Sequence, residues 1–254
     1  MRIVRQRRGQ FIIIAALLVA IMMVSVSTIM YSAVTYYRHE RWEEYLSIID
    51  DVKMGSQRVV EISLANYTWN NCTNNTILRK NLQQWVNDTK RAYAGFGINL
   101  SYSLTGDGLS DEEDWYKQVS FSAADATFTL GITSAGLTGY QFTASALLNV
   151  TIIEASWNAS GQELIISLAV YKEDSIPAPP VTDLKKSNFR VSVNGTWLAP
   201  EHFTVVRYYD GKTFIYDIDC NLEDIGDPPY PVRVEVIDTR GIKVVADETV
   251  TAPT

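Results

Sequence analysis

The stretch RRGQFIIIAALLVAIMMVSVSTIMYSAV, residues 7–34, decides how this chain is organised. Residues 11–34 carry no charged side chain. A helix of about 24 residues is ~36 Å long, which is enough to cross a hydrocarbon core of about 30 Å with some tilt. We therefore predict a transmembrane helix at residues 11–34, because no other stretch of the sequence is apolar over such a length.

Charged residues on either side of this helix predict its orientation. Residues 1–10 hold four arginines and no acidic residue, whereas residues 38–44 mix both signs. The positive-inside rule places residues 1–10 in the cytoplasm as a basic leader and the bulk of the chain outside the cell. Without these four arginines, 18 basic residues stand against 29 acidic ones, which argues against nucleic-acid binding. The sequence thus predicts a single-pass membrane protein with an acidic extracellular part.

Sequons for N-linked glycosylation support export. Eight of the thirteen asparagines begin an Asn-x-Ser/Thr sequon, where random placement would give about two. All eight follow the membrane segment, and we predict that they carry glycans on the outer surface. The alternative is that segments rich in Thr, Ser and Asn produce sequons by composition alone. The eight are Asn66, Asn71, Asn74, Asn87, Asn99, Asn149, Asn158 and Asn194.

Apolar residues continue with helical spacing beyond the membrane segment. They recur in steps of three and four from Trp42 to Leu64, opposite a face rich in acidic residues. Gly55 marks the place where a kink would cost least. We predict one helix from residue 10 to about residue 65, of which residues 35–65 form an amphipathic stem.

Residues 66–173 combine a second helix with strands in a predicted extracellular α/β domain. Asn75 or Thr76 is suited to cap a helix at residues 77–94. Alternation of apolar and polar residues then predicts half-buried strands. The predicted strands are 98–105, 115–122, 126–134, 140–157 with a break near 144–147, and 163–172.

Prolines separate this domain from the last part of the chain. Residues 174–183 contain three prolines in four positions, which predicts a stiff linker. Residues 184–254 hold short strands between turn dipeptides such as Asn194-Gly195, and we predict an immunoglobulin-like (Ig-like) β-sandwich there. The predicted fold class is α+β, with a long N-terminal transmembrane and stem helix, a second helix, an antiparallel β domain and this sandwich. The strands expected in the sandwich are 189–193, 203–209, 213–220, 232–238 and 242–246.

Motifs for catalysis are absent from the sequence. Two histidines cannot supply a multi-histidine metal site, and neither a phosphate-binding loop nor a nucleophile motif is present. We therefore predict a non-enzymatic protein without a cofactor. One acidic loop is a weak candidate for Ca²⁺, and the alternative is a solvated loop that protects a sheet edge. Its carboxylates are Asp107, Asp111, Glu112 and Asp114.

The chain has two cysteines, Cys72 and Cys220, both in the part predicted to be extracellular. A disulfide between them would close a long loop and stabilise the protein by ~4 to 5 kcal/mol in the chain-entropy description. Two free buried thiols are the alternative. The sequence leaves both open.

The N-terminal layout resembles that of archaeal type IV pilin-like proteins. Arg7-Arg8-Gly9-Gln10, an uncharged helix, an amphipathic stem and a β-rich head follow in the same order. The resemblance implies that a prepilin peptidase cuts between Gly9 and Gln10 on the cytoplasmic side. It also implies that the hydrophobic helix then packs with other copies, or with other pilin-like subunits, in a filament core.

Three fates of the N-terminus remain open from the sequence. It is a pilin-type leader, an uncleaved signal anchor, or a signal peptide cut near residues 25–27. Ile14 stands where many pilins carry a glutamate, which favours an anchor that does not polymerise. The function we expect is a glycosylated surface protein, assembled or anchored through its first helix as a pilin-like filament subunit or pseudopilin. The alternative is a single-pass adhesion or envelope-binding protein.

Overall fold

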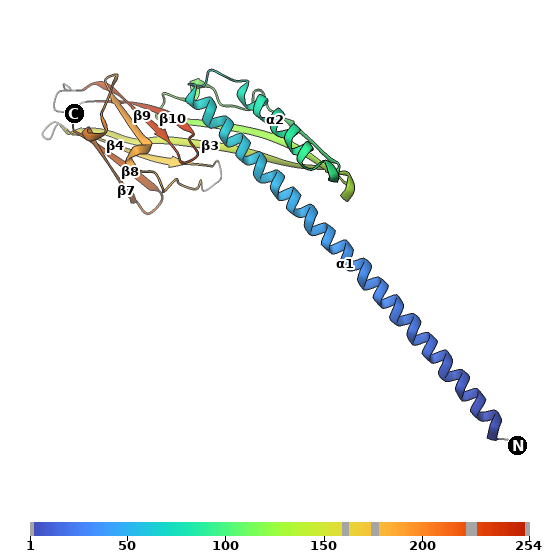
Figure 1. The fold of residues 1–254 in the computed structure, drawn as a ribbon. Coiled ribbons are helices and arrows are strands. Elements are labelled where there is room, and N and C mark those ends of the chain that lie inside the picture. The colour runs from blue at the N-terminus through green and yellow to red at the C-terminus, as the bar shows by residue number, and fades with distance from the viewer. Residues whose placement is uncertain (1–2, 159–162, 174–177, 222–227, 252–254) are drawn as a thin grey trace. The chain divides into compact units, whose positions relative to one another are not determined.

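The computed structural model describes residues 3–158, 163–173, 178–221 and 228–251, with side chains from residue 11 on except those of 35–41. The chain divides into two compact units, residues 1–51 and 52–254. The boundary lies inside the first helix, α1, which runs without interruption over Ile3–Trp69 (Figure 1). The prediction of one long N-terminal helix is therefore confirmed. It ends at Trp69, one turn later than expected, and the Trp69 indole bonds to the Gly241 carbonyl of the β domain.

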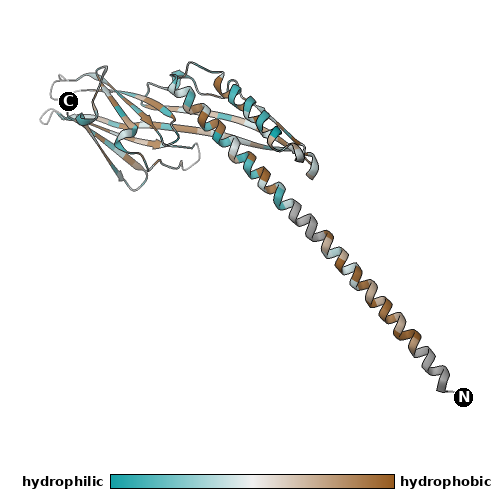
Figure 2. Ribbon diagram, in the orientation of Figure 1, coloured by the Kyte–Doolittle hydropathy of each residue, from teal (hydrophilic) through white to brown (hydrophobic). Residues whose placement is uncertain are grey.

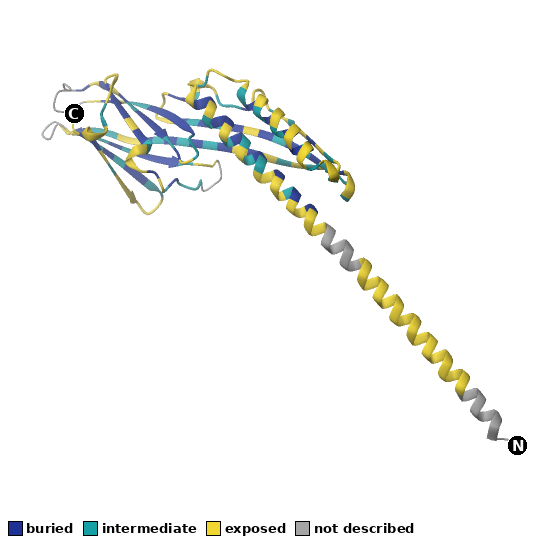
Figure 3. Cartoon of the chain, in the orientation of Figure 1, coloured by how far each residue is buried: buried dark blue, intermediate teal, exposed yellow. Residues whose placement is uncertain are grey.

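The first unit contains the apolar part of α1, residues 11–34. Figure 2 shows this part as a nearly unbroken hydrophobic stretch, and Figure 3 shows it as exposed throughout. Phe11–Val34 is long and apolar enough to cross a membrane, and none of it is buried within the structure. Ser25 and Thr28 donate their hydroxyls to the carbonyls four residues earlier in the same helix. These two hydroxyls are thus satisfied within α1 itself.

The second unit contains the end of α1, a second helix and two antiparallel sheets. Helix α2 covers Ile77–Ala92. The larger sheet has six strands in the order β1 (Ile98–Ser103), β2 (Val119–Ile132), β3 (Leu137–Asn158), β4 (Glu163–Tyr171), β8 (Phe214–Asn221) and β7 (Phe203–Tyr209). The smaller sheet has the order β10 (Lys243–Val250), β9 (Tyr230–Ile237), β5 (Phe189–Val193) and β6 (Thr196–Trp197). Short 3-10 turns lie at Ala94–Phe96, Glu112–Asp114, Thr133–Ala135, Lys186–Asn188 and Pro200–His202.

The six-stranded sheet corrects the predicted division into two β modules. Strand β8 from the predicted C-terminal sandwich pairs along its length with β4 from the predicted α/β domain. Leu164 lies opposite Cys220 and Ile166 opposite Ile218, and all four side chains are buried. Their joint burial explains why the two segments share one sheet. The strands of residues 184–254 are thus divided between the two sheets and do not form a domain of their own. The antiparallel sheets agree with the predicted α+β class, and the Ig-like arrangement stays a prediction.

The proline-rich segment does not act as a linker where it is described. Val181 donates its N–H to the Val170 carbonyl at 2.8 Å, and Pro180 forms an isolated bridge with Tyr171. The chain therefore returns along the end of β4 instead of leaving it. Residues 174–177 of the predicted linker lie outside the described residues.

Strands β2 and β3 are longer than predicted. Residues 119–132 form one strand instead of parts of two, and β3 is continuous over 22 residues with an irregularity between Ile152 and Glu154. The break expected near 144–147 is absent from β3. Small side chains occur there because Ala144 and Ala146 are buried where α1 crosses β3, as shown by the hydrogen bond from Gln57 to the Ser145 carbonyl.

A helix and the smaller sheet pack against the six-stranded sheet. Helix α2 contacts β1 near one end, and β10 of the smaller sheet lies against β2 and β3. An aromatic cluster joins the helices to the sheet. The Trp85 ring of α2 meets Phe128 edge-on at 5.6 Å, and Phe128 stacks on Phe142 at 5.3 Å. Most of the buried hydrophobic side chains therefore belong to the second unit, and Tyr45 and Ile48 near the end of the first unit are buried as well.

Candidate functional site

The exposed apolar span of α1 is the feature with the clearest functional meaning. Every residue from Phe11 to Val34 is exposed, and large side chains such as Phe11 at 79% and Met22 at 68% have no cover. Apolar surface of this extent is stable only in lipid or against other apolar helices. Residues 7–10 of the predicted processing motif lie in the first turns of α1, and their side chains fall outside the described part.

The last part of α1 is fixed to the head by side-chain bonds. Gln57 donates to the Ser145 carbonyl at 2.7 Å, and the Trp69 indole N–H donates to the Gly241 carbonyl at 2.9 Å. These two bonds join α1 to β3 and to the turn between β9 and β10. They lie three turns apart on the helix, so they hold this part of α1 at both ends.

Arg240 reinforces the same contact from the β9–β10 turn. Its Nε lies 2.7 Å from Asp238, its Nη2 donates to the Leu147 carbonyl at 2.7 Å, and its Nη1 lies 3.8 Å from Glu61 of α1. Only 21% of the Arg240 side chain is exposed. A guanidinium with three partners orients the turn toward the helix.

Gly55 is a packing position and not the kink that the sequence indicated. A Cβ atom at residue 55 would lie 3.0 to 3.3 Å from three ring atoms of Trp85. The absence of a side chain therefore lets α1 and α2 approach with the indole between them. Helix α1 continues through this residue without interruption.

Seven of the eight sequon asparagines are exposed. The exception is Asn149 in β3, which is half-buried and accepts a hydrogen bond from Thr151 at 3.2 Å. Three sequons, at Asn66, Asn71 and Asn74, gather at the end of α1 and in the turn that follows. Surface position makes these seven asparagines accessible to modification, and their glycosylation stays a prediction.

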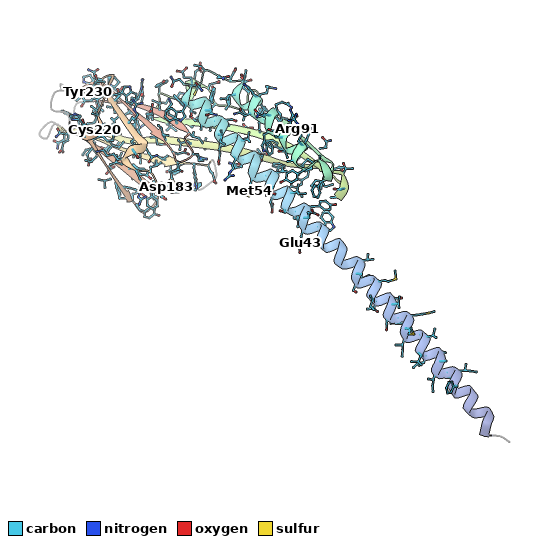
Figure 4. The ribbon with its side chains drawn as sticks, viewed as in Figure 1. Glu43, Met54, Arg91, Asp183, Cys220 and Tyr230 are labelled. Atoms are coloured by element: carbon cyan, nitrogen blue, oxygen red, sulfur yellow. The ribbon has the colours of Figure 1, made fainter. Side chains whose placement is uncertain are left out.

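Both cysteines are free thiols, so of the two alternatives that the sequence left open for Cys72 and Cys220, a disulfide or two free thiols, the structure shows the second. Cys72 follows the end of α1, whereas Cys220 lies in β8 and is labelled in Figure 4. Burial raises the pKa of Cys72 to about 12, with a further upward effect from Glu112. Burial also raises the pKa of Cys220 to about 12, helped by Asp219. Both thiols are therefore protonated and unreactive near neutral pH.

The acidic loop uses its carboxylates for its own structure. Asp114 accepts a hydrogen bond from the Asp111 N–H at 3.3 Å, and Asp107 accepts one from the Asn75 side chain at 3.0 Å. Lys117 lies 3.8 Å from Asp114. Within the described residues, no group of three or more His, Cys, Asp or Glu side chains is placed to hold a metal ion. These contacts favour the solvated-loop interpretation.

A buried lysine forms a cluster that the sequence analysis missed. Lys243 of β10 is only 7% exposed, and its Nζ donates to Asn71 Oδ1 at 2.8 Å and lies 4.0 Å from Glu235 Oε2. The same Nζ lies 5.3 Å from the ring centre of Trp115 and 5.9 Å from that of Trp69. A lysine inside an apolar strand pattern was the available signal. Its partners could not be inferred because they lie far away in the sequence.

Backbone contacts fix the position of the strand that carries this lysine. The Lys243 N–H donates to Thr68 Oγ1 of α1 at 3.1 Å, and its carbonyl accepts from Ser122 of β2 at 2.8 Å. Ser122 in turn accepts from the Trp115 indole at 2.9 Å. The cluster therefore sits where α1, β2 and β10 meet, and the buried ammonium has a fixed set of neighbours.

Two open grooves border α2. One of about 310 Å³ lies between α1 and α2 and includes Ile62, Asn66 and Trp85 in its lining. The other, of about 340 Å³, follows the free edge of β1 and includes Arg79 and Lys90. The first groove is lined mainly by apolar and amide side chains, and the second combines these two basic side chains with Ser101 and Tyr102 of β1.

Comparisons with known proteins give no family. No protein-family model, no curated protein sequence and no solved structure matches this chain.

Proposed function

We propose that this chain is a non-enzymatic surface protein that is assembled through its N-terminal helix as a pilin-like subunit. In this proposal residues 11–34 cross the membrane before assembly and pack against like helices afterwards. Residues 52–254 form the head outside the cell. The exposed sequons, all within or beyond the last part of α1, agree with such a head being extracellular.

One observation supports the proposal above the others: α1 passes from a fully exposed apolar span into the core of the head without a break. A simple anchor needs only the span and a flexible connection. Here the same helix that carries the apolar span also supplies buried side chains to the folded domain, such as Val60 and Leu64. A subunit that is assembled through its first helix uses one helix in both roles.

A single-pass adhesion or envelope-binding protein is the second candidate. Ile14 favours it, because an uncharged residue there lacks the carboxylate that helps register subunits in many pilins. Both candidates share the outward orientation, and they differ in the fate of the first nine residues.

Sequencing the N-terminus of the mature chain from native membranes tests the proposal. We expect the chain to begin at Gln10. An intact Met1 would favour the single-pass anchor, and a start near residues 25–27 would remove the apolar helix and overturn both candidates. Electron microscopy with an antibody against the head then separates filaments from single copies.

A further inference from the structure

The contact between the buried Lys243 and the exposed Asn71 has the composition of a site for an intramolecular cross-link. We propose that Lys243 Nζ and Asn71 Cγ become joined by an isopeptide bond. The Lys243 ammonium already donates to Asn71 Oδ1 at 2.8 Å, so the nitrogen lies next to the carboxamide that it would attack. The proposal concerns the head alone and does not depend on the proposed function.

The reaction balances without an oxidant or a co-reactant. The Lys243 ammonium gives one proton to a neighbouring base, and the resulting amine attacks Asn71 Cγ to form the new C–N bond. The attacking nitrogen passes its second proton to Asn71 Nδ2, the bond from Cγ to Nδ2 breaks, and this nitrogen leaves as ammonia. Ammonia then takes the first proton from the base, so a lysine ammonium and a primary amide give a secondary amide and an ammonium ion.

Glu235 is the base that the geometry assigns to this step. Its Oε2 lies 4.0 Å from Lys243 Nζ, and the residue is 6% exposed. The carboxylate would accept the proton from the lysine and pass it to the departing nitrogen. Arg190 lies 3.2 Å from the other oxygen, Oε1, which holds the carboxylate in place and leaves Oε2 directed to Lys243.

Aromatic and backbone groups limit the motion of the reacting pair. The rings of Trp115 and Trp69 flank the lysine nitrogen, and bonds to Thr68 and Ser122 fix the Lys243 backbone. Asn71 has a left-handed backbone with φ of 49°, which directs its side chain back to the head. Such restraint is what lets two weakly reactive groups combine at a useful rate.

The cross-link and a glycan at Asn71 exclude each other. Asn71 begins the sequon Asn71-Cys72-Thr73, and an N-linked glycan is attached through Nδ2. This is the nitrogen that leaves in the proposed reaction. We therefore infer that Asn71, unlike the other exposed sequon asparagines, is unglycosylated in the cross-linked protein.

The bond would join the turn after α1 to the first residue of β10. It would close a loop of most of the head, from residue 71 to residue 243, with a link that reductants do not break. The link would tie the end of α1 to β10, so a force that pulls on the apolar span could not draw α1 away from β10.

Peptide mass spectrometry of the full-length chain decides the proposal. The chain is expressed in a host without N-glycosylation, purified in detergent and digested under reducing conditions. We expect a branched peptide that contains both Asn71 and Lys243 and is lighter by about 17 Da, the mass of ammonia, than its two parts. Recovery of the two peptides unlinked and at full mass would overturn the proposal.

The intact mass alone is insufficient, because an N-terminal glutamine also loses ammonia when it cyclises, and processing at Gly9 would expose Gln10. Two variants therefore accompany the wild type. K243R should abolish the branched peptide, whereas K117R, at an exposed lysine that pairs with Asp114, should leave it unchanged. A branched peptide that persists in K243R would show that the link involves another residue.

The variant E235Q tests the role of the carboxylate. It keeps the shape of the side chain and removes the base, so we expect at least a tenfold lower cross-linked fraction in a chain that retains the wild-type circular dichroism spectrum. An unchanged fraction would overturn the assignment of Glu235. T73A, made in a glycosylating host, removes the sequon without altering Asn71 and should give the same branched peptide.

Discussion

The two parts of α1 on either side of its middle differ in how their apolar residues are used. Residues 11–34 are apolar on every side, and all of them are exposed. Residues 52–69 are less apolar, yet one face of them is completely buried, with Val60 and Leu64 at 0% exposure. The more hydrophobic part of the helix thus contributes nothing to the core of the head, and the less hydrophobic part is central to it.

This difference shows that the pattern of apolar residues, and not their number, decides what a helix packs against. A stripe with a period of 3.6 residues fits one folded partner and leaves polar residues to face water. An all-round apolar surface fits lipid or a bundle of like helices. One continuous helix can therefore belong to two environments, and each can be disturbed separately.

The largest effect is expected from charges in the exposed part. M22R/M23R places two arginines at the centre of the span, where each costs about 2.5 to 3.5 kcal/mol of insertion free energy. We expect most of the protein to leave the membrane fraction, as measured by carbonate extraction and immunoblotting. The control S32R lies near the end of the span, where the long side chain reaches the interface, and should remain in the membrane. Equal behaviour of both variants would contradict a transmembrane span.

A large effect on folding is expected from the docked part. L64A removes a side chain with no exposure and should lower the free energy of unfolding by about 2 to 5 kcal/mol. I62A, two residues away on the same helix and 57% exposed, should change it by less than about 1 kcal/mol. Urea unfolding of the full-length chain in detergent, followed by circular dichroism at the sheet wavelength, measures both. Similar losses would mean that the helix is not docked on one face.

A smaller effect is expected where α1 meets α2. G55A gains about 1 kcal/mol from helix propensity, but its Cβ meets the Trp85 ring at 3.0 Å, and the displaced indole should leave a net loss of about 1 to 2 kcal/mol. Trp85 fluorescence should shift as the ring moves. G95A is the control, because no atom lies within 4 Å of the added methyl group. If G55A is more stable than the wild type, the inference that α1 and α2 pack too closely at Gly55 for a side chain is contradicted.

Local patterns in the sequence were sufficient for the helices and for most strands. The apolar run predicted the first part of α1, and strands β5 and β7 lie at the predicted residues. These features depend on neighbours in the sequence, such as alternation and turn dipeptides. Their positions therefore needed no knowledge of what they pack against.

Pairing between distant segments could not be predicted in the same way. Nothing in the alternating pattern of β8 indicates that its partner is β4 and not another strand of the C-terminal segment. The same holds for Lys243, whose contacts Asn71 and Trp115 are 172 and 128 residues away in the sequence. The two cysteines were compatible with a bond or with free thiols, and only the fold shows that they are free thiols.

The smallest effect expected is a loss of folding stability at alkaline pH. It should affect the docked part of α1 and the rest of the head, but not the membrane span. The pKa of Tyr67 is raised from 10.0 to about 12 by burial, and those of Cys72 and Cys220 are raised from 9.0 to about 12. Between about pH 9 and 12 the folded chain therefore keeps protons that the unfolded chain releases, so the free energy of unfolding falls as pH rises through this range.

Urea midpoints at pH 8 and pH 10 should show a loss for the wild type and a smaller loss for C220A, which lacks one of the three groups. The membrane fraction should stay constant over the same range, because residues 11–34 hold no thiol and no charged side chain, and their one phenol, Tyr31, lies near the end of the span. An equal loss in C220A and the wild type would show that Cys220 does not titrate with the fold.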